Sequence, residues 1–218
     1  MLDVSTIFAE LSTLPAPLRF SDLFGDGRPV EFEVGPGKGL FLVNEAARRP
    51  DRGYIGVEYA RKYAKLAAER IAKHDLKNVK VVYGDAVLCL ARYIADASLA
   101  GVHIYFPDPW WKKRHKKRRV FREQFVVEVA RALKPGGNFR LATDVKEYFD
   151  VMIDLLSFHP EFEPLPPPEP NSPENDLDYL TNFERKYRIE GRSIHRASFR
   201  LRDDWIAPKG VNQVETLS

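Results

Sequence analysis

The sequence predicts one α/β domain built on a doubly wound, mostly parallel sheet with helices on both faces. Two observations predict this fold. Short apolar runs of strand length alternate with longer segments in which apolar residues recur at helical spacing. The first run also passes directly into a glycine-rich turn and then a helix, the order found at ligand sites of open α/β sheets. The chain of 218 residues is long enough for one domain with a full core.

The elements expected from the residues alone follow each other regularly along this chain. The expected strands are Val30–Val34, Gly53–Glu58, Val79–Tyr83, Val102–Phe106, Phe139–Asp144 and Ser193–Leu201. The expected helices are Leu40–Ala47, Tyr59–His74, Ala86–Tyr93, Phe121–Leu133, Tyr148–Leu155 and Thr181–Tyr187. Lys134-Pro135-Gly136-Gly137 should end the fourth of these helices.

The two ends of the chain carry weaker patterns. Prolines and glycines interrupt residues 1–29, which we expect to form a mobile lead-in with a short helix over Ser5–Leu14. Residues 30–206 are expected to form the single domain, with Pro164–Pro170 as a stiff connector inside it. Residues 207–218 are expected to be a tail.

The composition excludes several classes of protein. It is ordinary for a globular domain, with 44% hydrophobic and 30% charged residues. Because the net charge is only +3, an anionic partner should meet one face rather than the whole surface. The single cysteine, Cys89, excludes an internal disulfide and a multi-cysteine metal site, and its neighbours favour a place in the core. Without a long apolar run or a signal pattern, we expect a cytoplasmic protein that binds no membrane and no metal.

The glycine-rich turn, Gly35-Pro36-Gly37-Lys38-Gly39, lies between two acids that make it more informative. Glu33 precedes the turn, and Glu58 ends the next strand, where an acid can accept both hydroxyls of a ribose. A carboxylate at Glu33 would repel a pyrophosphate and attract a cation. We therefore expect S-adenosylmethionine, which carries an ammonium, a sulfonium and a ribose. The alternative is that Glu33 is a surface residue on an alternating strand, like Glu31.

Acids also end the remaining central strands. Asp85 should bond the adenine amino group, with the Ala86 amide at a ring nitrogen, and is equally suited to cap the following helix. Asp108 follows the fourth strand, and Asp144 ends the fifth and is expected also to cap the next helix. Since parallel strands end at a common edge, all five acids should line one rim of the sheet.

Residues 106–119 form the most specific segment. Two prolines stiffen the backbone on either side of Asp108, and the pair Trp110-Trp111 leads into a basic run. A rigid acid, flat aromatic rings and clustered cations suit a base and its phosphates. The alternative is a turn aspartate beside a solvated charge run, but its position directly after a strand favours a functional site.

Together these motifs resemble those of class I S-adenosylmethionine-dependent methyltransferases and, within that class, the bacterial tRNA (guanine-N7-)-methyltransferases of the TrmB family. The resemblance covers roughly residues 30–202. Its motifs are Glu33-Val-Gly-Pro-Gly-Lys-Gly, Ile55-Gly-Val-Glu58, Gly84-Asp85-Ala86, Phe106-Pro-Asp-Pro-Trp with Lys112-Lys-Arg-His, Thr143-Asp144 and Thr181-Asn-Phe-Glu184. The block from Phe106 is highly specific, although Trp111 stands where the family usually has Pro or His.

The resemblance implies a Rossmann-like, seven-stranded sheet whose last strand is antiparallel. The cofactor-binding residues that it implies are Glu33, Gly35, Gly37, Glu58, Asp85, Ala86 and Asp108. The implied substrate-binding residues are Lys112, Asp144, Thr181, Asn182, Phe183 and Glu184. The tRNA backbone would be held by Lys113, Arg114, His115, Lys116, Lys117, Arg118 and Arg119. The expected partner is tRNA, bound by a monomer or a homodimer.

The reaction implied is methyl transfer from S-adenosylmethionine to N7 of guanine-46 in the variable loop of tRNA. N7 carries a lone pair and no proton, so no general base is needed, and positioning can supply about 7–11 kcal/mol of the barrier. Asp108 is the expected catalytic residue, because a fixed carboxylate favours the positive charge that develops on the purine. It can also accept hydrogen bonds from the guanine N1–H and N2 amine.

Three alternatives remain open from the sequence. An amino-group methyltransferase acting on adenine N6 or cytosine N4 would use a similar motif after the fourth strand, to which Asp108-Pro-Trp is a near match. A catalytically silent RNA-binding protein would not need the full set of strand-end acids. A nicotinamide dehydrogenase is disfavoured, because Glu33 would repel its pyrophosphate and the basic run would have no use.

Overall fold

The structure is a computed structural model that describes residues 3–110, 119–166 and 180–206. Its centre is one sheet with the strand order β1-β4-β3-β2-β5-β6-β8-β7. The strands are β1 (Phe8–Glu10), β2 (Val30–Val34), β3 (Gly53–Glu58), β4 (Val79–Tyr83), β5 (Leu99–Tyr105), β6 (Leu133–Thr143), β7 (Phe162–Leu165) and β8 (His195–Leu201). All neighbours pair in parallel except β6 with β8 and β8 with β7. The expected doubly wound α/β fold with an antiparallel last strand is confirmed.

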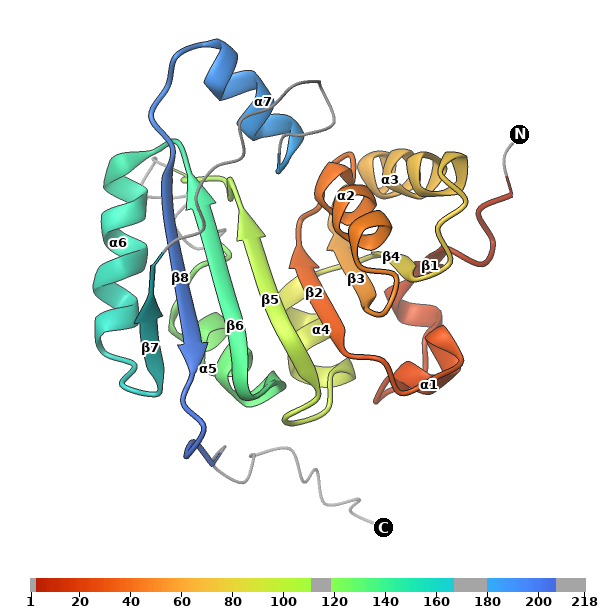
Figure 1. Cartoon of the computed structure of the whole chain (residues 1–218), viewed down its shortest axis with the longest axis horizontal. Helices are drawn as coiled ribbons and strands as arrows, with labels where there is room; N and C mark the ends of the chain where they lie inside the picture. Colours follow the sequence, from red (N-terminus) through yellow and green to blue (C-terminus); the bar gives the residue numbers. More distant parts are fainter. Residues whose placement is uncertain (1–2, 111–118, 167–179, 207–218) are drawn as a thin grey trace.

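Helices cover both faces of the sheet (Figure 1). They are α1 (Phe20–Phe24), α2 (Leu40–Arg48), α3 (Arg61–Lys73), α4 (Ala86–Tyr93), α5 (Glu123–Ala132), α6 (Lys146–Ser157) and α7 (Asn182–Ile189), with a short 3-10 helix at Leu11–Thr13. One core forms where α4, α5 and α6 pack on the sheet, and a second forms under α2 and α3. Because both faces are covered, β2 and β3 are buried along their whole length.

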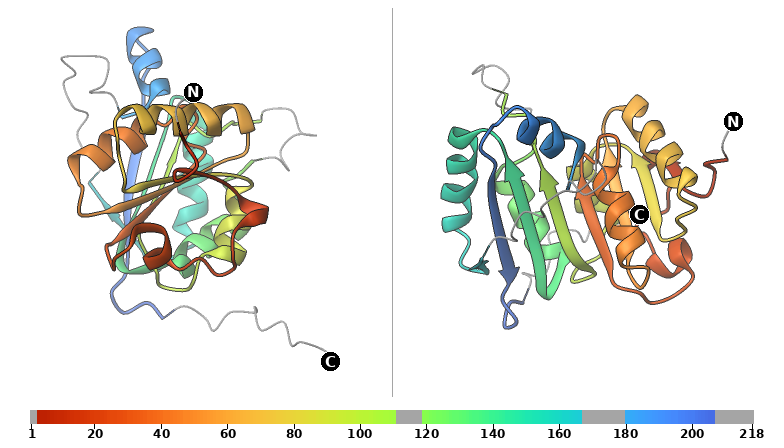
Figure 2. Two further views of the ribbon diagram at one scale, coloured as in Figure 1. Left: turned by 90° about the vertical axis from the view of Figure 1, so that its right-hand side faces the viewer. Right: turned by 45° about the horizontal axis from the view of Figure 1, so that its top comes forward.

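The five central strands end in register at one edge. Val34 of β2 lies beside Val57 of β3 and Ile104 of β5. Val57 in turn lies beside Val82, and Ile104 beside Leu141. The strand order reverses between β2 and β5, where an open α/β sheet leaves a crevice for ligands. Helix α7 lies above this edge in both Figure 1 and Figure 2, and we call the edge with its loops the rim.

The expected helix over Ser5–Leu14 is wrong. Residues Phe8–Glu10 form β1, which extends the sheet by pairing with β4, and the chain then makes a single 3-10 turn. Ile7, Leu11 and Leu18 are buried, so the segment before β2 contributes to the core. Without β1, the backbone N–H and C=O groups along the outer edge of β4 would be unpaired, and β1 satisfies them. Local propensity alone does not reveal this pairing.

The sheet has eight strands rather than the expected seven, with β1 as the additional edge strand. The opposite edge strand, β7, was not expected, and its last two residues, Pro164 and Leu165, fall within the expected connector Pro164–Pro170. Pro164 lies within β7, which is compatible with the sheet because an edge strand tolerates a residue that cannot donate a hydrogen bond. Residues 167–170 of that connector lie outside the described residues.

We predict that Leu11→Ala lowers the free energy of unfolding by about 2–5 kcal/mol, the usual cost of emptying a buried leucine site. The Leu11 side chain packs against the backbone of Gly84, where an added Cβ would lie 2.7 Å from the Leu11 Cβ. Urea unfolding measures the change. The matched control is Ser12→Ala at the next, exposed position, which should stay close to wild type. Equal stability of both variants would show that this segment is not part of the cooperative core.

Candidate active site

Glu58 fixes the glycine-rich turn after β2 by hydrogen bonds to the backbone. Its carboxylate accepts a hydrogen bond from the Gly37 N–H at 2.9 Å and one from the Ala60 N–H at 2.8 Å. Gly35, Gly37 and Gly39 all have positive φ, of 65°, 56° and 72°, a conformation that side chains disfavour. The turn therefore presents bare backbone at the crevice. Glu58 still has lone pairs available, since a carboxylate can accept about four hydrogen bonds.

Glu33 is the most unusual group in the crevice. It is 3% exposed, and its Oε2 atom has no hydrogen-bond partner. Burial raises the pKa of this carboxyl well above its ordinary value, and the nearby charge of Glu58 raises it further. An unsatisfied buried carboxyl is costly, so this position needs a partner from outside the chain. A cationic group such as an ammonium fits that requirement, and a pyrophosphate does not.

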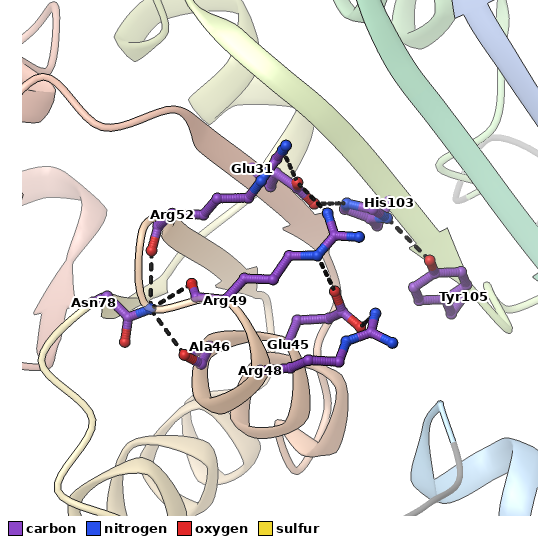
Figure 3. Close-up of polar contacts among 9 residues, drawn as sticks. All are labelled: Glu31, Glu45, Ala46, Arg48, Arg49, Arg52, Asn78, His103 and Tyr105. Atoms are coloured by element: carbon purple, nitrogen blue, oxygen red, sulfur yellow. Dashed lines mark hydrogen bonds and ion pairs between the residues drawn. The ribbon is translucent and has the colours of Figure 1, made fainter. Parts of the chain in front are cut away.

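Glu31 lies two residues earlier on the same strand and has a different environment (Figure 3). Arg52 donates a hydrogen bond to it at 2.5 Å, and its other oxygen lies 2.7 Å from the His103 Nε2 atom. Burial alone would raise the pKa of Glu31, but His103 and Arg52 outweigh burial and lower it to about 2. Glu31 is therefore a satisfied structural anion. The alternative that Glu33 is an exposed equivalent of Glu31 is wrong, because both are buried and only Glu31 is paired.

The hydrogen bonds continue from Glu31 along β5. The His103 Nδ1 atom lies 2.9 Å from the Tyr105 hydroxyl, and Phe41 of α2 packs against both rings at centroid distances of 4.6 and 5.1 Å. Since an ionised Glu31 carboxylate can only accept, the His103 Nε2 atom carries a proton and donates to it. Asn78 similarly ties β4 to the end of α2 by donating to backbone carbonyls there, including that of Ala46 (Figure 3).

Asp85 caps α4, as expected. Its Oδ1 atom accepts hydrogen bonds from the Val87 and Leu88 N–H groups at 2.8 and 3.0 Å. Both bonds use the same oxygen, and the side chain is exposed on the rim next to Ala86. The capping role is confirmed, and the role of Asp85 and Ala86 at adenine stays a prediction.

The loop after β5 carries Asp108 in a strained backbone. Phe106 and Trp110 have positive φ, of 53° and 42°, which costs about 1–3 kcal/mol for each such residue. The Arg119 guanidinium holds the loop by donating to the Pro109 carbonyl at 2.7 Å, and it lies 4.9 Å from the centre of the Tyr148 ring. Asp108 is exposed, so the loop presents a fixed carboxylate to the rim.

Helix α7 covers the rim. Thr181 caps it by accepting from the Glu184 N–H at 3.0 Å, and the buried Glu184 carboxylate accepts from the Leu180 N–H at 3.1 Å. Glu184 also accepts from Arg196 of β8 at 2.5 Å. Asn182 accepts from Arg70 of α3 at 3.2 Å. These contacts fix α7 between α3 and β8.

An aromatic cluster connects α7 to the loop after β5. The Phe106 ring lies 6.1 Å from that of Phe183 and 5.4 Å from that of Tyr187. A Cβ added at Gly37 would lie 4.0 Å from the Phe183 ring, so Phe183 reaches the glycine-rich turn. Burial raises the pKa of the Tyr187 hydroxyl, and the charges of Asp144 and, more weakly, Asp108 raise it further. Both of these aspartates therefore lie near Tyr187.

Asp144 does not cap α6, which corrects the expectation. The residue before that helix is Val145, whose N–H bonds the Thr143 hydroxyl, and no side chain caps the helix. Asp144 instead accepts from Arg192 at 2.9 Å, and the Arg192 guanidinium lies 4.7 Å from the centre of the Tyr187 ring. Asp144 can pair with Arg192, which follows α7 in the sequence, because the chain returns to this edge of the sheet after β7.

The structure thus brings most of the expected site residues to one rim. Those described there are Glu33, Gly35, Gly37, Glu58, Asp85, Ala86, Asp108, Arg119, Asp144, Thr181, Asn182, Phe183 and Glu184. Lys112, Lys113, Arg114, His115, Lys116, Lys117 and Arg118 lie outside the described residues, as does Trp111. Phe106, Tyr187 and Arg192 were missed, although Tyr187 follows Phe183 by one helical turn and so shares its face.

Within residues 3–110, 119–166 and 180–206, no group of three or more His, Cys, Asp or Glu side chains is arranged to hold a metal ion. No helix in the same ranges is long and apolar enough to cross a membrane.

A doubly wound sheet with acids and a glycine-rich turn at the carboxyl ends of its central strands is typical of enzymes that bind a nucleotide-type cofactor. A family model described as "Putative methyltransferase" matches residues 27–197. The chain is 44% identical over 208 residues to the tRNA (guanine-N(7)-)-methyltransferase of Rhodopirellula baltica, covering 92% of this chain and 76% of that protein. It is 39% identical to the protein of the same name from Alkalilimnicola ehrlichii, covering 86% and 78%.

Among solved structures, the 16S rRNA methyltransferase KamB superposes with a TM-score of 0.61 at 16% identity, over 84% of this chain and 92% of that one. That likeness supports the fold. The match to the family model and the two relatives shows more: this chain belongs to the methyltransferase family that includes the tRNA (guanine-N(7)-)-methyltransferases.

We predict that Glu33→Gln makes the ligand-free protein more stable than wild type near neutral pH, because the variant has no carboxyl group whose ionisation is opposed by burial. The folded pKa of Glu33 lies above its ordinary value of 4.5, so wild type loses stability as pH rises past that value. The advantage of the variant should therefore vanish below pH 4.5. Chemical unfolding as a function of pH measures it.

The matched control is Glu31→Gln, which should behave in the opposite way. The folded pKa of Glu31 is about 2, below its ordinary value of 4.5. Its contribution to stability is therefore present above pH 4.5 and is lost as pH falls toward 2. The control should be less stable than wild type near neutral pH. The same sign of effect for both variants would contradict the assigned environments.

Proposed function

We propose that this protein transfers a methyl group from S-adenosylmethionine to N7 of the variable-loop guanine of tRNA. The observation that carries the proposal is the 44% identity, over 92% of the chain, to a tRNA (guanine-N(7)-)-methyltransferase. The geometry of the rim supports it independently, because the unpartnered carboxyl of Glu33 suits a cationic ligand and the loop after β5 carries an exposed carboxylate, Asp108. A tRNA substrate would make the protein cytoplasmic.

The cofactor fits the residues present. The unpartnered Oε2 atom of Glu33 would take the cationic end of S-adenosylmethionine, and the backbone of the turn at Gly35 and Gly37 would lie against it. Glu58 would accept from the ribose hydroxyls with its remaining lone pairs. Asp85 and the Ala86 N–H would meet the adenine edge. When bound, the cofactor supplies a methyl group on a sulfonium, so that attack by N7 releases a neutral thioether.

The chain's own residues mainly position the reactants. No base has to remove a proton from N7, so the barrier is lowered by alignment. The strained loop from Phe106 to Trp110 holds Asp108 rigidly, so its carboxylate needs little reorganisation as positive charge develops on the purine. The same carboxylate can accept from the guanine N1–H and N2 amine, which adenine does not offer at that edge.

Helix α7 and the basic run would hold the RNA. Phe183 is 48% exposed, so its ring is accessible for stacking on a base. Thr181 and Glu184 keep α7 formed and anchored, so part of their contribution is structural. Residues 112–118 would grip the phosphates. Arg119, whose guanidinium bonds the Pro109 carbonyl, would connect that grip to the loop of Asp108.

The direct test uses purified protein, unmodified tRNA and S-adenosylmethionine with a labelled methyl group. Nucleoside mass analysis of the product should find the label in N7-methylguanosine from the variable loop. Label in N6-methyladenosine or N4-methylcytidine would replace the proposal with an amino-group methyltransferase. Binding of tRNA without any transfer, and without binding of the cofactor, would indicate a silent RNA-binding protein.

We predict that Asp108→Asn lowers kcat/KM for tRNA by about 100-fold or more, the usual effect of removing one preorganised charge from a reacting centre. Because the carboxylate is proposed to be catalytic, we also expect Asp108→Ala to abolish turnover. Because Asp108 is exposed, both variants should unfold like wild type. The control is Asp154→Asn, an exposed aspartate near the carboxyl end of α6 that is not one of the rim residues. Near-normal turnover in either Asp108 variant would contradict the catalytic role.

A further inference from the structure

We infer that the outer face of α3 is a second tRNA-binding surface, which contacts the ribose-phosphate backbone away from the target nucleotide. We call it the α3 face, formed by the outward residues Lys62, Tyr63, Lys65, Leu66, Glu69, Arg70 and Lys73, with Tyr59 just before the helix. The inference rests on the proposed function. It adds a surface that lies outside the glycine-rich turn, the Asp108 loop, the basic run and α7.

The first reason is the charge of the helix. Residues Arg61–Lys73 contain five cations, at positions 61, 62, 65, 70 and 73, and one acid, Glu69. Arg61 pairs with Glu10 at 2.6 Å, and Arg70 donates to Asn182. Lys62, Lys65 and Lys73 form no ion pair with any residue in the described ranges. By contrast, Lys146 on the outside of α6 is neutralised by Asp150 at 2.6 Å.

The second reason is the apolar and aromatic surface between these lysines. Tyr63 and Leu66 are 44% and 37% exposed, and Tyr59 is 78% exposed. The buried stripe of α3, which includes Ala64, Ala67 and Ile71, already satisfies its packing on the sheet. Rings that alternate with cations suit a chain of sugars and phosphates, because the rings contact ribose or unpaired bases while the lysines meet the phosphates.

The third reason is position. Tyr59 directly follows Glu58 at the end of β3, so the α3 face begins at the rim. The Arg70–Asn182 hydrogen bond joins α3 to α7, which lies above the same edge (Figure 1). A polyanion lying on α7 can therefore extend onto the α3 face without a break. Helix α6, beyond the other side of α7, carries Glu147 and Asp154 besides the Lys146–Asp150 pair, so its net charge is negative and would not attract the polyanion.

This charge difference between α3 and α6 determines on which side of α7 the rest of the bound tRNA would lie. With the target guanine under α7 and Asp108 beside it, the remaining tRNA would run over α3 and not over α6. Surface lysines contribute to RNA binding chiefly by neutralising phosphates and releasing counterions, so their contribution falls as salt rises. That dependence distinguishes a phosphate contact from a role in folding or in cofactor binding.

The test is the double variant Lys62→Glu/Lys65→Glu, with binding of unmodified tRNA followed by fluorescence anisotropy over a range of salt concentrations. We expect the Kd for tRNA to rise roughly tenfold or more at low salt, and the slope of log Kd against log salt to fall by about 1.5, as for two lost phosphate contacts. The Kd for S-adenosylmethionine should not change. Tyr63→Ala should weaken tRNA binding severalfold with the slope unchanged, since stacking is not ionic.

The matched control is Lys134→Glu, an exposed lysine near the start of β6, at the edge of the sheet away from the rim. It makes the same change of charge and should leave both the Kd for tRNA and the salt slope close to wild type. If the double variant shows the wild-type slope while the wild type methylates tRNA, the inference is overturned and the proposed function stands. If the wild type neither binds nor methylates tRNA, the proposed function fails, and this inference fails with it.

Discussion

The parallel pairing of β2 with β5 is the contact on which the site depends. These strands lie at the reversal of the sheet, where Glu33 lies beside His103 in register. The pair formed by Glu31 and His103 joins the same two strands by a buried, charged hydrogen bond of 2.7 Å. Since the glycine-rich turn follows β2 and the Asp108 loop follows β5, this pairing sets the distance between the two halves of the crevice. A shift of one residue would turn Glu33 to the other face of the sheet.

Glu31 and Glu33 show how one strand can carry two carboxyls with opposite tasks. Glu31 is neutralised by groups of the chain itself, Arg52 and His103. Glu33 is kept without a partner beside a second acid, Glu58, which raises its pKa. Such an arrangement lowers the stability of the empty protein and is tolerated where a ligand supplies the missing charge. Because both residues are glutamates, the sequence does not reveal this difference, which arises from groups that are remote in sequence.

The central part of the fold and the acids of the rim were predictable from local pattern. The alternation of apolar runs placed β2 to β6 with their helices, and a parallel sheet forces strand ends such as Glu58 and Asp108 to a common edge. The edge strands were not predictable, since β1 is short and β7 contains Pro164, and both form because neighbours offer backbone groups. The position of α7 was likewise hidden, because Arg70 and Arg196 reach it from separate elements and Arg192, just after it, pairs with Asp144.

The route of the chain through α7 has a consequence for how such a protein can diverge. Helix α7 lies between β7 and β8, the two antiparallel strands at one margin of the sheet, whereas Glu33 and Glu58 come from the parallel strands near its middle. The segment that connects β7 and β8, including α7, can be replaced without altering the order of the inner strands. If α7 binds the acceptor as proposed, the segment between β7 and β8 can change in sequence or length while the strands that carry Glu33 and Glu58 keep their order, so a change of specificity is best engineered there.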